Sequence, residues 1–160
     1  MDRMSARIIP EAENLNKGIS KGELVGITFE VINGNPRHLK LFITGPKDSP
    51  YEGGTFEFRV FYNERYPTVP PLVKLQTKIY HPNINGLGQV CLNILKEDGW
   101  SPAIQLTSLA MSLRGLLESP NTDDPLDVNV NKHFLTKPAE AKKMAKDMTA
   151  KFAMTYSTTK

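Results

Sequence analysis

The chain has 160 residues, of which 39% are hydrophobic and 23% charged, proportions that are ordinary for a soluble globular domain. The formal net charge of +3 is too small to indicate nucleic-acid binding, and no stretch approaches the ~18 apolar residues of a membrane-spanning helix. The single cysteine, Cys91, excludes an intramolecular disulfide and fits a reducing compartment. We therefore expect one domain over residues 1–160, in the cytoplasm or nucleus, without nucleic-acid or membrane partners.

The N-terminal half predicts one helix followed by several strands. Residues 5–16 have a helical pattern, and Pro10 fits if the regular helix begins near it. Alternating apolar residues predict strands at 27–31, 39–43, 55–62 and 73–76. Phe61 lies alone on the polar face of the third strand, where it is either an incidental exposed aromatic or an anchor for a partner. The proline-rich run 66–71 predicts a rigid connection and is compatible with a cis bond at Tyr66–Pro67.

The C-terminal half predicts helices. Leucines at helical spacing indicate a helix over 106–117, with Thr107 or Ser108 as its cap. A short helix follows from Leu126, and a longer one runs from Pro138 to near Tyr156. Its buried stripe is predicted to be Ala141, Met144, Met148 and Phe152. The lysines of this segment are expected to form a solvated face rather than a polyanion site. The order of elements predicts an α+β fold with an antiparallel meander.

The strongest functional signal surrounds Cys91. A loop rich in glycine and asparagine precedes it, and Asn83 lies eight positions upstream in a His-Pro-Asn turn. A nucleophilic thiol needs a group that stabilises charge on the carbonyl it attacks, and a rigidly held amide can do this. A lone cysteine can also be a small buried apolar residue. The irregular loop and the amide favour a functional thiol, with the carboxylates of Asp123 and Asp124 on a later loop.

Other chemistries are weaker interpretations of the same residues. His81 is the obvious base for a cysteine–histidine hydrolase, but it is equally a residue that stabilises the turn. The nearest cation in sequence is Lys96, so the thiol is expected to be only weakly activated. Such a thiol suits the acceptance of an already energised acyl group better than attack on an amide. Three histidines and one cysteine show no metal-ligand spacing, and no nucleotide-binding motif is present.

Five motifs in register resemble the ubiquitin-conjugating enzymes across about residues 5–156. They are Tyr66-Pro67-x-x-Pro70-Pro71, Tyr80-His81-Pro82-Asn83, Gly88-x-x-Cys91-Leu92, Trp100-Ser101-Pro102 and Pro120-Asn121-x-Asp123-Asp124-Pro125. The resemblance implies a four-stranded antiparallel meander with an N-terminal helix, a central helix and two C-terminal helices. It also implies an enzyme that needs no cofactor, because the activating enzyme uses the ATP.

The resemblance assigns a role to each candidate site residue. Cys91 would accept ubiquitin as a thioester from the ubiquitin-activating enzyme, and a substrate lysine would then attack it. Asn83 would stabilise the oxyanion or hold the loop, and Asp124 would orient or deprotonate the lysine. Tyr80 and Leu92 would shape the groove.

Within the family, the chain is most similar to the branch that pairs with a catalytically inactive variant subunit and builds polyubiquitin chains. Phe61 falls where that branch carries its anchor for the variant subunit. A RING-type ligase would contact Arg7, Thr68 and Pro102.

Several positions depart from the branch pattern. Asn93 stands where the branch has aspartate, and asparagine there also occurs in the enzyme for NEDD8. Thr68 replaces a bulky apolar residue that contacts the ligase, and Pro10 replaces a basic residue. Arg59 replaces an acidic neighbour of the anchor residue, Phe61. Conjugation of another ubiquitin-like modifier is thus one alternative. A non-catalytic module that binds ubiquitin or a ligase is another, although relatives with that role lack the cysteine.

Overall fold

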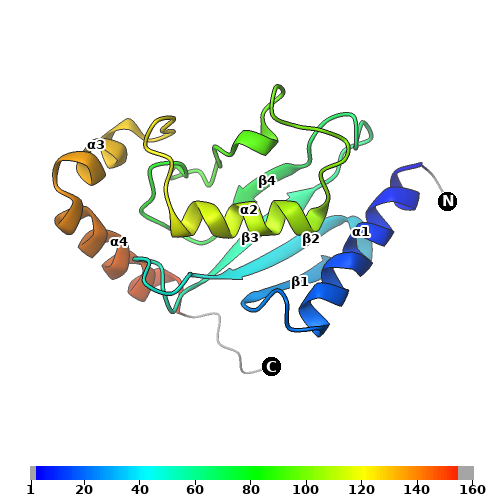
Figure 1. The fold of residues 1–160 in the computed structure, drawn as a ribbon, viewed down its shortest axis with the longest axis horizontal. Coiled ribbons are helices and arrows are strands. Elements are labelled where there is room, and N and C mark those ends of the chain that lie inside the picture. The colour runs from blue at the N-terminus through cyan, green and yellow to red at the C-terminus, as the bar shows by residue number, and fades with distance from the viewer. Residues whose placement is uncertain (1–2, 155–160) are drawn as a thin grey trace.

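The computed structural model describes residues 3–154, in which one helix and four strands precede the remaining helices (Figure 1). The elements are α1 Arg3–Ser20, β1 Ile27–Ile32, β2 Asn35–Thr44, β3 Thr55–Phe61, β4 Leu72–Leu75, the 3-10 turn η1 Asn93–Leu95, α2 Leu106–Glu118, α3 Val128–Thr136 and α4 Pro138–Phe152. The predicted α+β order is confirmed, including the two C-terminal helices.

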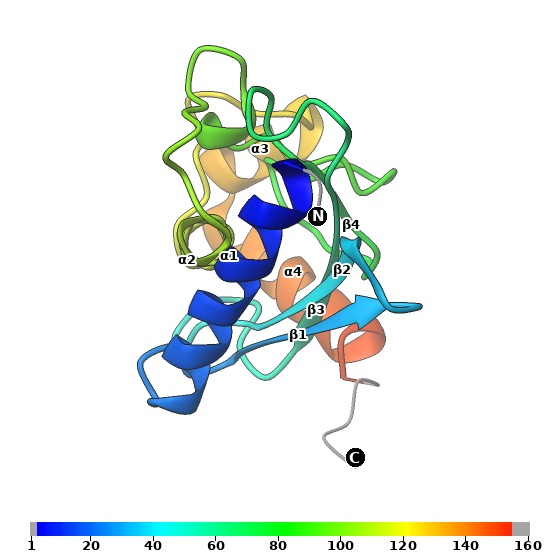
Figure 2. The same cartoon turned by 90° about the vertical axis from the view of Figure 1, so that its right-hand side faces the viewer.

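The four strands form one antiparallel sheet in the order β1-β2-β3-β4, a meander in which each strand pairs with the next. Helix α2 crosses one face of this sheet, α1 lies towards one end, and α3 and α4 lie at the other (Figures 1 and 2). In β3, Phe56, Phe58 and Val60 are completely buried, whereas Phe61 is 39% exposed. The alternation expected from the sequence is therefore confirmed, and it leaves one aromatic ring at the surface.

Helix α1 continues through Pro10, so the prediction that the regular helix begins near this proline is wrong. A proline inside a helix removes one hydrogen bond to the carbonyl four residues earlier. Pro10 and Ala6 both lie on the exposed face of α1, where water can satisfy the carbonyl that Pro10 leaves free. The buried face keeps Met4, Ile8 and Leu15, and packing of that face outweighs the cost.

Helix α2 is capped from another helix, so the prediction of Thr107 or Ser108 as its cap is wrong. Its N-cap position is Gln105, whose side chain makes no capping hydrogen bond. Instead the backbone N–H of Leu106 donates to the Glu11 carboxylate at 2.8 Å. A carboxylate at a helix N-terminus satisfies a free donor and is stabilised by the helix dipole. Glu11 thus joins α1 to α2 inside the protein.

The buried stripe of α4 consists of Ala141, Ala145 and Thr149. Of the predicted stripe only Ala141 is confirmed: Met144 is exposed, and Met148 and Phe152 are half-buried. The loop carrying Gly54 lies against α4 at Thr149, near the end of this stripe. A Cβ at Gly54 would lie 2.7 Å from Thr149 Cγ2. Met144 lies outside the buried stripe and is 45% exposed. The helix ends at Phe152, and Tyr156, near which the sequence placed its end, lies outside the described residues.

Across residues 3–154, none of the helices combines the length and the apolar character needed to cross a bilayer.

Candidate active site

The loop before Cys91 is fixed by a turn built on His81. Its Nε2 donates to the Leu116 carbonyl at 2.8 Å, and its Nδ1 accepts from the Asn83 backbone N–H at 2.9 Å. The ring is fully buried, and burial lowers the pKa of His81 to about 4. A neutral ring with both nitrogens occupied cannot serve as the base for Cys91. His81 therefore stabilises the turn, and the hydrolase interpretation loses its base.

Close packing fixes the same loop farther along. Gly88 has φ +82°, and a Cβ there would lie 2.1 Å from the Leu75 carbonyl oxygen. Only glycine fits both constraints. The Leu75 N–H donates to the Gly88 carbonyl at 2.8 Å, which fastens the loop to strand β4. The backbone that leads to Cys91 is thus held from two sides.

Asn83 is completely buried, and its side chain makes all its hydrogen bonds to backbone groups. Its Nδ2 donates to the carbonyls of Asn121 at 2.8 Å and Asp124 at 3.0 Å, and its Oδ1 accepts from the Asn121 N–H at 2.8 Å. Both amide hydrogens are therefore used within the protein. Of the two roles that the sequence left open, this geometry favours holding the 121–124 loop over direct donation to an oxyanion.

Cys91 is brought to the same loop. Its backbone N–H donates to the Asn83 carbonyl at 2.8 Å, and its half-buried Sγ lies 3.6 Å from the Asp124 carboxylate oxygen Oδ2. Burial raises the pKa of the Cys91 thiol, Lys96 lowers it and Asp124 raises it further. The resulting thiol is accessible but weakly acidic. The expectation of a weakly activated nucleophile agrees with this environment.

Asp124 is paired with Lys96, whose Nζ lies against its Oδ2. Both side chains are substantially exposed, at 47% and 39%. The hydrogen bond from Lys96 lowers the pKa of Asp124, so the carboxylate is ionised beside the thiol at neutral pH. The sequence identified Asp124 but gave Lys96 only as the nearest cation in sequence, since nothing in the pattern shows that η1 returns this lysine to the loop.

The two residues expected to shape the groove are both fixed in place, Tyr80 by hydrogen bonds and Leu92 by packing. The Tyr80 hydroxyl donates to His133 Nδ1 at 2.7 Å, and the Tyr80 carbonyl accepts from Tyr51 at 2.6 Å. Tyr80 is therefore anchored to α3. Leu92 follows the thiol, is half-buried and packs against the core.

Three of the predicted partner-contact residues lie on one surface. Arg7 Nη2 donates to the Pro102 carbonyl. Thr68 is exposed, and it follows Pro67, whose carbonyl accepts from Trp100 at 2.8 Å. Phe61, the fourth, is exposed at the end of β3, where it packs edge-on against His38 with ring centroids 5.8 Å apart.

Sequence reasoning missed Glu11, a buried residue that contacts several of the residues beneath this surface. Its carboxylate accepts from the Tyr66 hydroxyl at 2.6 Å and pairs with Arg7, besides capping α2. The available signal was its position on the apolar face of α1, between Ile8 and Leu15. A carboxylate on a buried face requires partners.

Among residues 3–154, no group of three or more histidine, cysteine or acidic side chains is arranged to hold a metal ion.

The family model for ubiquitin-conjugating enzymes matches residues 9–149. The chain belongs to the ubiquitin-conjugating enzyme family. It is 41% identical over 154 residues to ubiquitin-conjugating enzyme E2 N of Drosophila melanogaster, covering 96% of this chain and 99% of that protein.

Two further relatives agree with this assignment. Ubiquitin-conjugating enzyme E2 13 of Saccharomyces cerevisiae is 40% identical over 153 residues, which are 96% of this chain and 97% of that protein. The solved E2 domain of a Toxoplasma gondii ubiquitin-conjugating enzyme superposes with a TM-score of 0.84 at 34% identity. The match covers 94% of this chain and 99% of that domain. The resemblance seen in the sequence is confirmed, and the chain is a ubiquitin-conjugating enzyme.

Proposed function

We propose that Cys91 accepts the C-terminus of ubiquitin as a thioester and passes it to a lysine amine. The Cys91 thiolate attacks the ubiquitin thioester carried by the activating enzyme, whose own thiolate leaves, so that one thioester replaces another. A lysine amine then attacks the carbonyl, the Cys91 thiolate leaves, and a proton is released as the isopeptide bond forms. The observation that carries this proposal is the half-buried thiol, held by Asn83 and lying 3.6 Å from the Asp124 carboxylate.

Asn83 and Asp124 have separate tasks in this proposal. Asn83 holds the 121–124 loop, and through it Asp124, in register with the thiol. Asp124 receives the acceptor lysine, and its present pairing with Lys96 supports its capacity to hold an ammonium group beside Cys91. Tyr80 and Leu92 line the path of the ubiquitin tail. The chain works as a single domain over residues 1–160, without a cofactor of its own, in the cytoplasm or nucleus.

The activity is tested by charging assays run side by side with ubiquitin, NEDD8 and SUMO, each with its own activating enzyme and ATP. We expect a mass increase of one ubiquitin that reductant removes and that is absent in Cys91→Ala. Charging by NEDD8 in preference to ubiquitin would support the alternative modifier, which the exposed Asn93 after Cys91 keeps open. A protein that binds ubiquitin but is never charged would be a binding module.

We further propose that the exposed end of β3 docks a catalytically inactive variant subunit, and that the enzyme builds polyubiquitin chains with it. Support comes from the exposed Phe61 ring, from the exposed Leu72 that pairs with it across β3 and β4, and from the similarity to E2 N. The activating enzyme and a RING-type ligase would use the surface formed by Arg7, Thr68 and Pro102.

Replacement of Phe61 by alanine tests the heterodimer. We expect Phe61→Ala to abolish binding to the variant subunit while Cys91 charging stays intact. Val31→Ala is the matched control, because Val31 is exposed to a similar extent, 42%, on the other edge of the sheet. Size-exclusion chromatography and chain synthesis measure the two effects. Equal chain synthesis by Phe61→Ala and the native protein would remove the assignment to this branch.

A further inference from the structure

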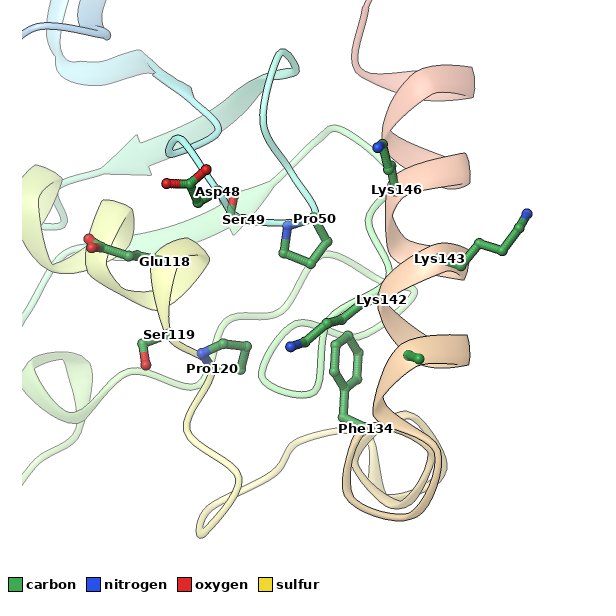
Figure 3. Close-up of a pocket in the computed structure, with 11 residues that line it drawn as sticks. Asp48, Ser49, Pro50, Glu118, Ser119, Pro120, Phe134, Lys142, Lys143 and Lys146 are labelled. Carbon is green, nitrogen blue, oxygen red and sulfur yellow. The ribbon is translucent and has the colours of Figure 1, made fainter.

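A cleft of about 590 Å³ lies between α4 and the 48–50 loop (Figure 3). The last residue of α2, Glu118, and the two that follow it, Ser119 and Pro120, form its third side, and Phe134 of α3 lies at one end. The volume is within the range of about 300–1,000 Å³ usual for ligand sites. None of the residues given a role in conjugation lines it. We call it the α4 cleft.

One wall of the α4 cleft presents two unpaired amines. Lys142 extends over the cleft towards Pro120, and Lys146 lies one helical turn farther along (Figure 3). Within the described part of the chain, neither amine has a carboxylate within ion-pairing distance, whereas Lys143 is paired with Asp147 at 2.9 Å. Lys143 also lines the cleft, but its amine end points away from it (Figure 3). Two adjacent lysines on α4 therefore differ in direction and in pairing.

The positive charge of the protein is concentrated around this wall. Residues 128–152 contain six lysines against two carboxylates, Glu140 and Asp147, a net charge of +4 that exceeds the +3 of the whole chain. The rest of the chain is therefore slightly acidic. A charge distribution of this kind attracts and orients anionic segments on approach.

The remaining surfaces restrict which anion fits. Pro50, Pro120 and Phe134 provide an apolar surface, and Asp48 and Glu118 are exposed on the side opposite α4 (Figure 3). A uniform polyanion such as a nucleic acid or a lipid bilayer would bring negative charge against these two carboxylates. A peptide can instead place acidic side chains towards α4 and apolar or basic ones elsewhere.

We propose that the α4 cleft docks an acidic segment of the protein that receives ubiquitin. Carboxylates of that segment pair with Lys142 and Lys146, and an apolar side chain covers Phe134. The cleft borders the catalytic loop, since Pro120 precedes Asp124 by four residues, a Cα–Cα separation of at most about 14 Å. A docked segment would thus hold a nearby lysine within reach of the thioester. This inference rests on the proposed function for its catalytic consequence, although not for binding itself.

Binding is tested with a fluorescein-labelled octapeptide that carries four glutamates, a phenylalanine and one arginine, by anisotropy at low salt. Exposed ion pairs are weak, so we expect Lys142→Glu to weaken binding about threefold and the double variant with Lys146→Glu about tenfold. Lys143→Glu makes the same change in net charge one residue away, and we expect it to change the affinity by less than about twofold. An equal loss of peptide affinity in Lys142→Glu and Lys143→Glu would overturn the proposal.

Two further probes distinguish the alternative ligands. A 20-nucleotide single strand and vesicles containing phosphatidylserine should bind more weakly than the peptide and discriminate less between the variants. Tighter binding of either probe would replace the peptide by a general polyanion and contradict the proposal.

Catalysis provides the last readout. Preformed ubiquitin thioester is mixed with a lysine peptide that carries the acidic segment, and with a neutral version of it. We expect the double variant to raise the KM for the acidic peptide about tenfold without changing kcat, and to discharge to the neutral peptide at the native rate. Charging at Cys91 in every variant serves as the folding control.

Absence of charging in the native protein would defeat the proposed function, and the anisotropy result alone would then decide whether the cleft binds an acidic peptide. An unchanged KM for the acidic peptide would overturn its role in substrate docking.

Discussion

The two sides of Cys91 differ in burial and in charge. On one side, Asn83 and His81 are completely buried, neutral and hydrogen-bonded at every polar side-chain atom. On the other, Asp124 and Lys96 are charged and nearly half exposed. The buried side resembles a protein core, whereas the charged side resembles a solvated surface.

This difference separates two requirements of acyl transfer. The groups around the thiol must be kept in position within a fraction of an ångström. Buried side chains with all their hydrogen bonds formed achieve this, but they cannot easily change partners. An acceptor lysine must also enter and leave, which needs a charged group that exchanges partners with little penalty. Exposed ion pairs contribute only about 0–1 kcal/mol and can be exchanged easily. We therefore expect changes on the buried side to have larger effects than changes on the charged side.

The largest effect is expected from Asn83→Ala. It leaves the Asn121 N–H and the carbonyls of Asn121 and Asp124 without their partner, which should lower the free energy of unfolding by about 2–4 kcal/mol. Because the loop carrying Asp124 is released, transfer to lysine should fall about 10³-fold, more than charging does. Urea unfolding and single-turnover discharge measure the two effects.

Asn85→Ala is the matched control for that variant. The Asn85 side chain bonds only within its own turn, to Leu87 and Gln89. It should leave transfer within about threefold of the native rate, because the loop is also anchored by Gly88 and His81. A loss equal to that of Asn83→Ala would mean that any change in this loop disrupts the site.

The next effect is expected from Asp124→Asn, which keeps the shape of the side chain and removes its charge. Transfer should fall about 10²-fold because the acceptor amine loses its carboxylate, while stability changes little. Asp123→Asn, one residue earlier and exposed, should have no comparable effect. A similar loss of transfer rate in Asp124→Asn and Asp123→Asn, measured by discharge assays, would show that only the overall charge of the loop matters.

A smaller effect is expected from acid, through His81. Its pKa is about 4 in the folded protein and about 6.5 when unfolded, so the unfolded state binds more protons between these values. The resulting stability is fully present above pH 6.5 and is lost as the pH falls towards 4. Between pH 7 and pH 4.5 this histidine should remove about 2–3 kcal/mol from the free energy of unfolding. NMR titration of the ring should show no protonation above pH 5, and a midpoint near 6.5 would contradict its buried role.

The smallest effect is expected at the charged side, in the reactivity of the thiol. Lys96 lowers the pKa of Cys91 and Asp124 raises it. At pH 7.5, Lys96→Met should therefore slow alkylation by iodoacetamide roughly threefold, and Asp124→Asn should accelerate it by a similar factor. The rate in the native protein should rise steadily between pH 7 and pH 9. Changes of the same sign in the two variants would mean that their charges do not act on the thiol.

The sequence predicted what depends on local pattern and missed what depends on contacts between distant segments. The alternation in β3 and the leucines of α2 determined the sheet, its main helix and the exposure of Phe61. Motif resemblance identified Cys91, Asn83 and Asp124. The cap that Glu11 supplies to α2 joins residues 95 positions apart, and no periodic pattern records such a pair. The same holds for Lys96, which lies 28 positions from Asp124.

The outward turn of Met144 shows a second limit. Helical spacing identified a stripe on α4 but could not choose between two neighbouring stripes. The buried stripe is Ala141, Ala145 and Thr149, and at Thr149 it meets Gly54, a contact between distant segments that helical spacing does not record.

The most direct test of the account is the chemical nature of the ubiquitin adduct on the native protein and on Cys91→Ser. Both are incubated with activating enzyme, ATP and ubiquitin, and intact masses are recorded before and after reductant. The account predicts one ubiquitin on the native protein that reductant removes, and on Cys91→Ser one that resists reductant and is cleaved by hydroxide. A reductant-resistant adduct on the native protein, or no adduct on either, would contradict it.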